Sequence, residues 1–119
     1  MVIKSKQRLF WLYPKLTSWM GGARFVFEAS KRLSKDYEVT IICQELSEDV
    51  LNEYSKADLN VIELKTPSFT DIKFWLFFKQ SIEQNSRKLT SIVNNDDKVI
   101  VSMFPMNCFA SKAGIKFTQ

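Results

Sequence analysis

The sequence predicts an α/β fold: a three-layer, Rossmann-like domain in which helices cover both faces of a parallel sheet. Apolar segments of strand length alternate with longer segments in which apolar residues recur at helical spacing. The strand-like segments are apolar almost throughout, rather than at every second residue, as is typical of parallel strands buried on both faces. Right-handed crossovers are expected to join the strands. We therefore expect residues 1–119 to form a single domain.

The first strand, loop and helix are expected to organise this domain. Leu9 to Tyr13 predict a buried strand, which Pro14 ends because proline lacks the N–H that a sheet requires. Gly21 and Gly22 permit a sharp turn and a close approach of the backbone to another group. The helix that follows would direct its unpaired N–H groups at this loop, which suits a phosphate. A turn that merely allows close packing would also explain the two glycines.

The rest of the chain continues the alternation of strands and helices. Three more strands are expected at 37–43, 60–64 and 98–103, and residues 115–118 resemble the start of a fifth. Helices are expected after Ser47, from Thr70 or Asp71 to about Val93, and from Asn107 to Ala113, where Gly114 stops the last one. Pro67 is expected to separate the third strand from the longest helix.

The helical periods predict which side chains face the core. In the first helix the predicted apolar face consists of Phe25, Val26, Ala29 and Leu33. In the longest helix the predicted stripe is Ile72, Trp75, Phe78, Ile82, Leu89, Ile92 and Val93, with Phe74 and Phe77 outside it. An aromatic cluster at this point of the chain, formed by Phe69, Phe74, Trp75, Phe77 and Phe78, is expected to pack in the core. Contact with a second domain and contact with a membrane interface are the alternatives.

Composition restricts the classes of function. The chain has no histidine, which excludes His-based metal sites, serine–histidine triads and Cys–His pairs within it, and no metal is expected. The net charge of +4 is spread along the chain without a basic block. This argues against nucleic-acid binding and suits phosphorylated ligands or an anionic membrane surface. Cys43 and Cys108 show no disulfide spacing and no secretory signal precedes them, so a cytoplasmic location is expected, with peripheral membrane contact as an option.

Two other α/β classes lack their motifs here. A dinucleotide-binding domain would need Gly-x-Gly-x-x-Gly directly after the first strand, and the loop before Gly21 is too long for that pattern. A receiver domain would need acidic residues after the first and third strands, where 13–15 and 65–67 contain none. A non-catalytic α/β binding or interaction module remains open.

The sequence resembles the N-terminal domain of GT-B glycosyltransferases, most closely the retaining enzymes of glycosyltransferase family 4. The resembling segments are Met-Gly-Gly-Ala-Arg at 20–24, Phe-Val-Phe-Glu-Ala-Ser-Lys-Arg-Leu at 25–33, Tyr-Glu-Val-Thr-Ile-Ile at 37–42 and Val-Ile-Val-Ser-Met-Phe-Pro-Met-Asn-Cys-Phe-Ala at 99–110. The resemblance implies transfer of a sugar, of hexosyl or mannosyl type, from a nucleotide-sugar donor to a glycan or lipid-linked acceptor. This chain would be the acceptor-side half, a fragment without the donor-binding domain, and inactive alone. No cofactor is implied.

The resemblance also implies a donor-facing loop. Gly21, Gly22, Ala23 and Arg24 would face the donor diphosphate across the cleft between the two domains. Backbone N–H groups there would stabilise the negative charge that develops on the leaving phosphate. Arg24 could add a positive charge, or it could be an ordinary solvated residue of the helix.

Three residues are candidates for binding the acceptor. Lys15, Ser102 and Asn107 follow predicted strands, and ligands of parallel sheets bind at the carboxyl ends of the strands. A small core residue would also explain Ser102, and a helix cap would also explain Asn107. No catalytic residue can be assigned within the chain.

Overall fold

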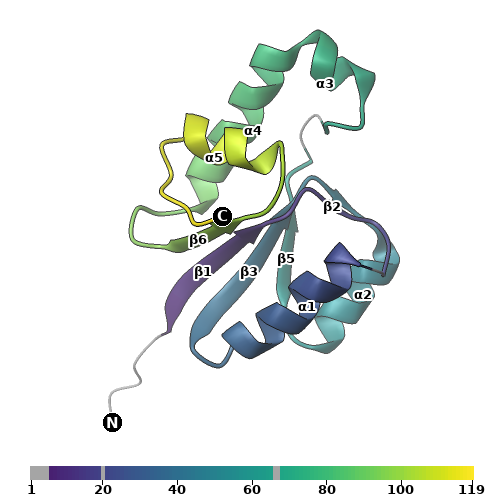
Figure 1. The fold of residues 1–119 in the computed structure, drawn as a ribbon, viewed down its shortest axis with the longest axis vertical. Coiled ribbons are helices and arrows are strands. Elements are labelled where there is room, and N and C mark those ends of the chain that lie inside the picture. Colours follow the sequence, from purple (N-terminus) through teal and green to yellow (C-terminus); the bar gives the residue numbers. More distant parts are fainter. Residues whose placement is uncertain (1–5, 20, 66–67) are drawn as a thin grey trace.

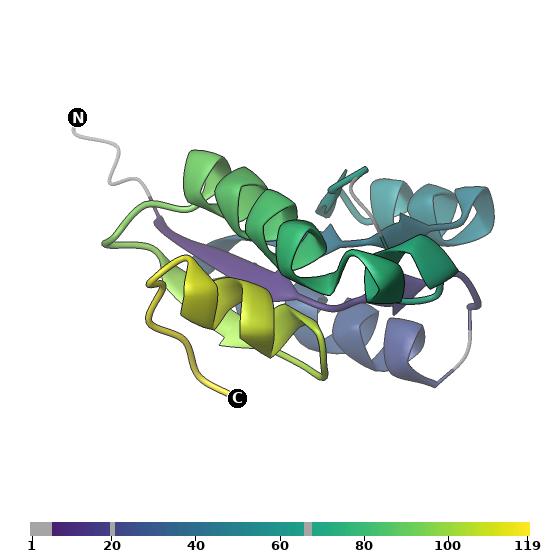
Figure 2. The same ribbon diagram turned by 90° about the horizontal axis from the view of Figure 1, so that it is seen from above.

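The structure is a computed structural model that describes residues 6–19, 21–65 and 68–119; the expected break at Pro67 therefore lies outside the described residues. Its main sheet is parallel and has the strand order β5-β3-β1-β6. The strands are β1 (Gln7–Leu12), β3 (Tyr37–Cys43), β5 (Asn60–Glu63) and β6 (Lys98–Val101) (Figure 1). Seen from above, β1 lies between helices on both sides (Figure 2). The predicted three-layer α/β class with a parallel sheet is confirmed.

Helices cover both faces of the sheet. α1 (Gly22–Leu33) and α2 (Glu48–Lys56) pack on one face, and α4 (Phe78–Ile92) and α5 (Met106–Lys112) pack on the other. β1 contributes Leu9 and Trp11 to the first core and Phe10 and Leu12 to the second, and all four side chains are buried. Burial on both faces explains why this strand is apolar at consecutive positions.

The chain order of the strands reverses beside β1. From β1 the chain proceeds through β3 to β5, and β6 then returns to the opposite side of β1. The switch point of the sheet therefore lies between β1 and β6, where open parallel sheets bind ligands. A second, two-stranded parallel sheet joins β2 (Lys15–Leu16) to β4 (Glu45–Leu46). The sequence had not predicted this pairing, which connects two loops at the carboxyl edge.

The buried face of α1 differs from the predicted one. Ala23, Val26, Phe27 and Ser30 are buried, whereas Phe25 is 65% exposed. Buried positions at i, i+3, i+4 and i+7 fit a helix, and the small Ala23 and Ser30 let the helix approach the sheet. The prediction is confirmed for Val26, and Ala29 and Leu33 are half-buried against the core, but it is wrong for Phe25 because it followed hydrophobicity alone.

The predicted long helix is two helices. α3 (Ile72–Leu76) and α4 are separated at Phe77, whose φ of −121° and ψ of 52° are not helical. Phe74, which the prediction left outside the stripe, is fully buried. The buried face of α4 includes Ser81, Asn85 and Ser86, which the apolar stripe had excluded. Asn85 and Ser86 make hydrogen bonds there, such as that from Ser86 Oγ to the Phe109 carbonyl at 3.1 Å.

The carboxyl-terminal segments also differ in detail from the prediction. β6 ends at Val101 rather than at 103. α5 has Pro105 at its N-cap, so Asn107 lies inside the first turn and the expected Asn107 cap is wrong. The expected fifth strand is limited to a single parallel bridge between Thr118 and Ile100.

Candidate functional site

The loop between β1 and α1 lies at the switch point, and its two glycines have different roles. Gly21 is exposed, has open space around it and adopts a φ of 54°, which favours glycine. Gly22 lies against the side chain of Tyr13, and a Cβ at this position would overlap the Tyr13 hydroxyl. Gly22 therefore packs closely against Tyr13 within this domain, and Gly21 is the more exposed of the two glycines.

The N-terminus of α1 is electrostatically open. Its N-cap is Gly21, no side chain of the described residues caps it, and its first turn contains no acidic residue. Arg24 in that turn is exposed, whereas Ala23 is buried. The first N–H groups of a helix have no acceptor within the helix and lie at the positive end of its dipole. This end of α1 can therefore accept an anion without displacing a protein carboxylate.

A buried tyrosine holds this first turn in place. Tyr54 of α2 donates its hydroxyl proton to the Ala23 carbonyl oxygen at 2.6 Å. Burial raises the pKa of Tyr54 well above its usual range, so the hydroxyl remains a donor. The orientation of the α1 N-terminus consequently depends on α2, a contact between segments far apart in sequence.

The three acceptor candidates do not form one cluster. Ser102 follows β6, and its Oγ accepts a hydrogen bond from Trp11 Nε1 at 3.0 Å. Lys15 is exposed in β2, and its partner in the neighbouring strand is Glu45 of β4, which follows β3. Lys15 therefore lies on the β3 side of β1, whereas Ser102 lies on the β6 side. Asn107 is half-buried, and its Oδ1 has no hydrogen-bond partner among the described residues. Ser102 is thus the candidate located at the switch point.

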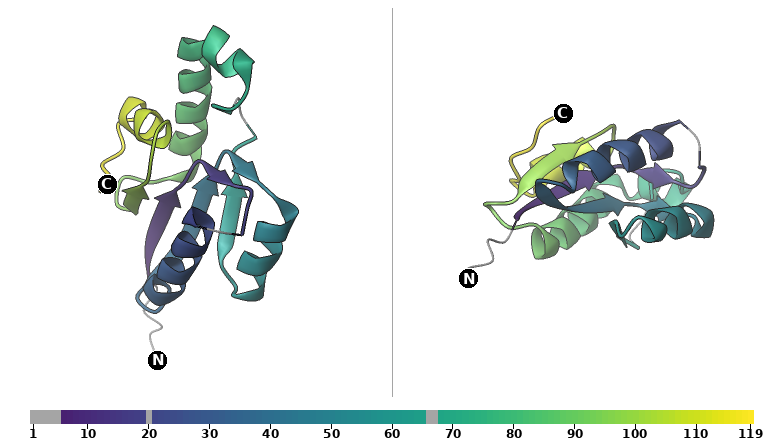
Figure 3. Two further views of the ribbon diagram at one scale, coloured as in Figure 1. Left: turned by 45° about the vertical axis from the view of Figure 1, so that its right-hand side comes forward. Right: turned by 90° about the horizontal axis from the view of Figure 1, so that it is seen from below.

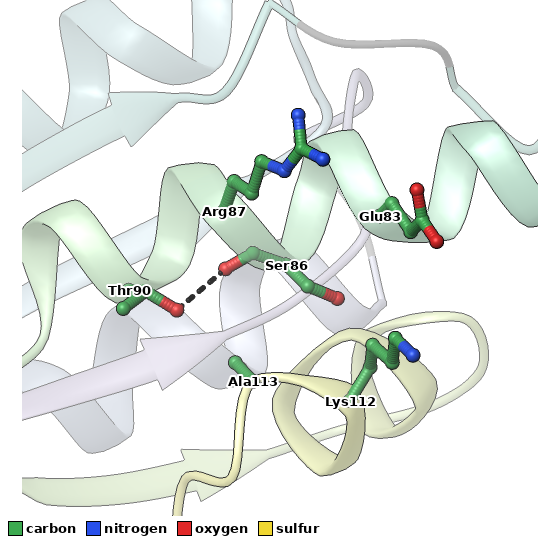
Figure 4. Close-up of a pocket in the computed structure, with 6 residues that line it drawn as sticks. All are labelled: Glu83, Ser86, Arg87, Thr90, Lys112 and Ala113. Atoms are coloured by element: carbon green, nitrogen blue, oxygen red, sulfur yellow. Dashed lines mark hydrogen bonds between the residues drawn. The ribbon is translucent and has the colours of Figure 1, made fainter.

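A pocket lies between α4 and α5, away from the N-terminus of α1. It has a volume of about 420 Å³ and is lined by Glu83, Ser86, Arg87, Thr90, Lys112 and Ala113 (Figure 4). The Thr90 hydroxyl donates to the Ser86 carbonyl at 2.9 Å, so these polar groups satisfy each other within the helix. Arg87 and Lys112 are exposed at its margin. The sequence had not indicated this pocket because its residues come from two helices that the fold brings together.

The part of the chain that the structure describes contains no cluster of three or more metal-ligating side chains. Cys43 is fully buried at the end of β3, and desolvation, with a smaller effect from Glu63, raises the pKa of its thiol to about 12. A thiol that stays protonated is a poor nucleophile, so Cys43 serves here as a small buried residue of the core.

Comparison with known proteins identifies similar folds. No family model and no curated protein matches the chain. The crystal structure of TcCGT1 in complex with UDP is 21% identical with a TM-score of 0.56, over 95% of this chain and 28% of that one. The C-terminal domain of the PF1911 hydrogenase from Pyrococcus furiosus is 16% identical with a TM-score of 0.55, over 99% of this chain and 95% of that one.

A second structure of the PF1911 domain gives 12% identity and a TM-score of 0.54. This chain therefore spans little more than a quarter of TcCGT1 and nearly all of the PF1911 domain. At these identities the likeness concerns the fold. The chain has a Rossmann-like α/β fold that is similar both to part of TcCGT1 and to the PF1911 domain.

Proposed function

We propose that the chain is the acceptor-side, N-terminal half of a GT-B glycosyltransferase, of the retaining family 4 type. The whole enzyme would move a sugar from a nucleotide-sugar donor to a glycan or lipid-linked acceptor, and a second domain would hold the donor. The observation that carries the proposal is the open N-terminus of α1, preceded by the exposed Gly21 at the switch point. The fold shared with TcCGT1, which was solved with UDP, supports it.

In this proposal the α1 N-terminus acts on the leaving group. As the bond between the sugar and the diphosphate breaks, negative charge develops on the phosphate oxygens. The N–H groups of the first turn and the exposed backbone of Gly21 donate to that charge from fixed positions, so little reorganisation is needed. Arg24 adds a positive charge from the same turn. The contact of Tyr13 with Gly22 fixes the shape of the loop.

Ser102 is the residue proposed to meet the acceptor. Its oxygen already accepts from Trp11, which fixes the hydroxyl at the end of the sheet. The hydroxyl proton is not used by that bond and can be donated to a sugar hydroxyl. Lys15 and Asn107 remain candidates for acceptor contact farther from the switch point.

The proposal is tested by following backbone amide signals by NMR while UDP is added to the 119-residue chain. Weak, millimolar binding is expected because half of the site is absent, with shifts concentrated at Gly21, Gly22, Ala23 and Arg24. The variant Arg24→Gln should weaken these shifts. Arg32→Gln is the matched control, because Arg32 is exposed in the last turn of the same helix. Shifts confined to the pocket between α4 and α5, or equal effects of both variants, would contradict the proposal.

The alternative function is a non-catalytic α/β binding or interaction module. The nearly end-to-end match with the PF1911 domain favours it, because that domain is about as long as this chain. The two functions differ in their response to glycans. Amide shifts around Ser102 on addition of oligosaccharides support the transferase half. A chain that responds to neither UDP nor any glycan supports the module.

A further inference from the structure

Exposed apolar side chains gather at one end of the molecule. They come from α3, the start of α4 and the loop between β6 and α5, and we call them the aromatic surface. Its members, each between 40% and 72% exposed, are Ile72, Trp75, Leu76, Phe77, Phe78, Met103 and Phe104. The prediction that this aromatic cluster packs in the core is wrong for all but Phe74, which is buried, and Phe69, which is half-buried.

The aromatic surface is ordered although it is exposed. Phe74 is fully buried and contacts the ring of Phe109, which anchors α3 to the second core. Trp75 stacks on Phe78 with ring centroids 5.7 Å apart and on Phe104 at 5.9 Å. Its indole nitrogen donates to the Phe69 carbonyl at 2.8 Å. The rings are therefore held in position, so burying them in a partner costs little side-chain entropy.

The shape and charge of this end of the molecule indicate the class of partner. α3 and the start of α4 protrude beyond the carboxyl ends of the strands in two views (Figure 1; Figure 3, left). Lys73 and Lys79 are exposed on the same segment. Asp71, two residues before Lys73, accepts from the Lys73 backbone N–H at 2.9 Å as a helix cap, and Glu83 follows four residues after Lys79. A protruding set of aromatic rings flanked by lysines matches the headgroup level of an anionic bilayer.

We propose that the aromatic surface docks this protein on an anionic lipid membrane. Leu76, Phe77 and the neighbouring rings enter the interface between headgroups and acyl chains, and Lys73 and Lys79 contact the lipid phosphates. The proposed contact is with the membrane surface. No helix in the described part of the chain is long and apolar enough to cross a bilayer. This inference goes beyond the proposed function, because membrane docking requires neither a donor nor an acceptor.

The test is flotation of the 119-residue chain with vesicles of phosphatidylcholine alone or mixed with phosphatidylglycerol. The wild type should float with the mixed vesicles. The double variant Leu76→Ser/Phe77→Ser should lose binding by about tenfold or more, because each lost apolar side chain removes interfacial burial. The matched control is Phe25→Ser/Leu51→Ser, which removes two apolar side chains that are 65% and 38% exposed elsewhere on the molecule, and it should bind like the wild type.

A charge variant completes the experiment. Lys73→Gln/Lys79→Gln should weaken binding to the mixed vesicles by about tenfold and leave binding to neutral vesicles unchanged. Circular dichroism of each variant checks that it is folded. The proposal is overturned if no vesicle is bound, if both double serine variants bind equally, or if Leu76→Ser/Phe77→Ser abolishes only self-association in a lipid-free sedimentation experiment. UDP-induced shifts at α1 are measured separately, so a failure here leaves the proposed function unaffected.

Discussion

The N-termini of α1 and α2 have similar positions in the fold but differ in charge and capping. Each helix follows a central parallel strand through a loop, and β2 and β4 pair these two loops with each other. α2 is capped by Ser47, which accepts from the Val50 N–H at 3.2 Å, and its first turn contains Glu48 and Asp49. α1 has neither a side-chain cap among the described residues nor an acid in its first turn.

The difference shows which of the two helix ends is complete in this chain. A serine cap and two carboxylates satisfy the N–H groups and the dipole of α2 within the protein. At α1 the same requirements are left to solvent or to a ligand, and the exposed Arg24 adds positive charge. The residues that follow the last pair of β1 and β3 differ too. Leu12 of β1 pairs with Ile42 of β3, and of the residues that come next, Tyr13 is half-buried whereas Cys43 is fully buried. The N-terminus of α2 is thus capped within the protein, and the N-terminus of α1 is left open.

The largest expected effect is on the pH dependence of stability, and it comes from Cys43, which is buried at the end of β3. Desolvation raises the pKa of Cys43 from 9.0 to about 12, so the unfolded thiol ionises while the folded thiol remains protonated. The unfolded state then binds fewer protons, and the free energy of unfolding falls as pH rises from about 9 towards 12. The slope approaches about 1.4 kcal/mol per pH unit from one thiol. Urea denaturation across this range measures it.

The variant Cys43→Ala should flatten the slope just above pH 9, whatever its effect on absolute stability. Tyr54 also has a raised pKa and adds to the loss at higher pH, so Tyr54→Phe should flatten only the upper part of the range. A slope that is the same in Cys43→Ala and the wild type would show that the thiol is not desolvated.

The second prediction concerns the packing of the α1 loop. Gly22→Ala places a Cβ where the Tyr13 hydroxyl lies, so the ring or the loop must move. We expect a loss of about 1–3 kcal/mol in the free energy of unfolding, measured by urea denaturation. In a Tyr13→Ala background the same substitution should cost much less, because the ring is absent. Additive effects of the two substitutions would mean that the contact does not determine the loop.

This contact illustrates how much of the site the sequence could predict. The strand–loop–helix order followed from apolar runs and glycines, and the Ser47 cap followed from local chemistry. The overlap of Gly22 with Tyr13 and the bond between Trp11 and Ser102, 91 residues apart, depend on how strands pair. No local pattern encodes such contacts. The sequence therefore predicted the position of the loop, but not that Gly22 packs against Tyr13 while Gly21 is exposed.

The helix faces were mispredicted for a related physical reason. Hydrophobicity ranks Phe25, Trp75 and Phe78 as core residues, yet each is at least 40% exposed. The buried positions include Ser30 and Ser86, where small side chains allow close packing and a hydrogen bond offsets the burial of Ser86. Apolar periodicity cannot detect a buried polar position or an exposed aromatic one, and both kinds occur in α1 and α4.

The third prediction concerns the link between the two helix ends. Tyr54→Phe removes the hydrogen bond from α2 to the Ala23 carbonyl while keeping the ring in place. We expect a loss of about 1 kcal/mol in the free energy of unfolding. Amide exchange should accelerate in the first turn of α1 and remain unchanged in the first turn of α2, which has its own cap. Tyr37→Phe in β3 is the control for loss of a tyrosine hydroxyl. Equal acceleration at both helix ends would contradict the one-sided dependence.

The smallest expected effects come from exchanging the charges of the two first turns. Arg24→Glu gives α1 the kind of charge that α2 already has, and should stabilise the protein by about 0.3–1 kcal/mol at low salt. Glu48→Gln should destabilise it by a similar amount, since a carboxylate near the dipole is lost. Salt should reduce both changes because these side chains are exposed.

The same pair of variants separates stability from ligand binding. If the open end of α1 is retained for an anionic ligand, Arg24→Glu should abolish the UDP-induced amide shifts while raising the melting temperature, and Glu48→Gln should leave the shifts unchanged. A more stable protein with a weaker site is the expected cost of closing a binding position. If Arg24→Glu leaves the shifts intact, the positive charge of the α1 turn has no role in binding, and the contrast between the two helices is one of stability alone.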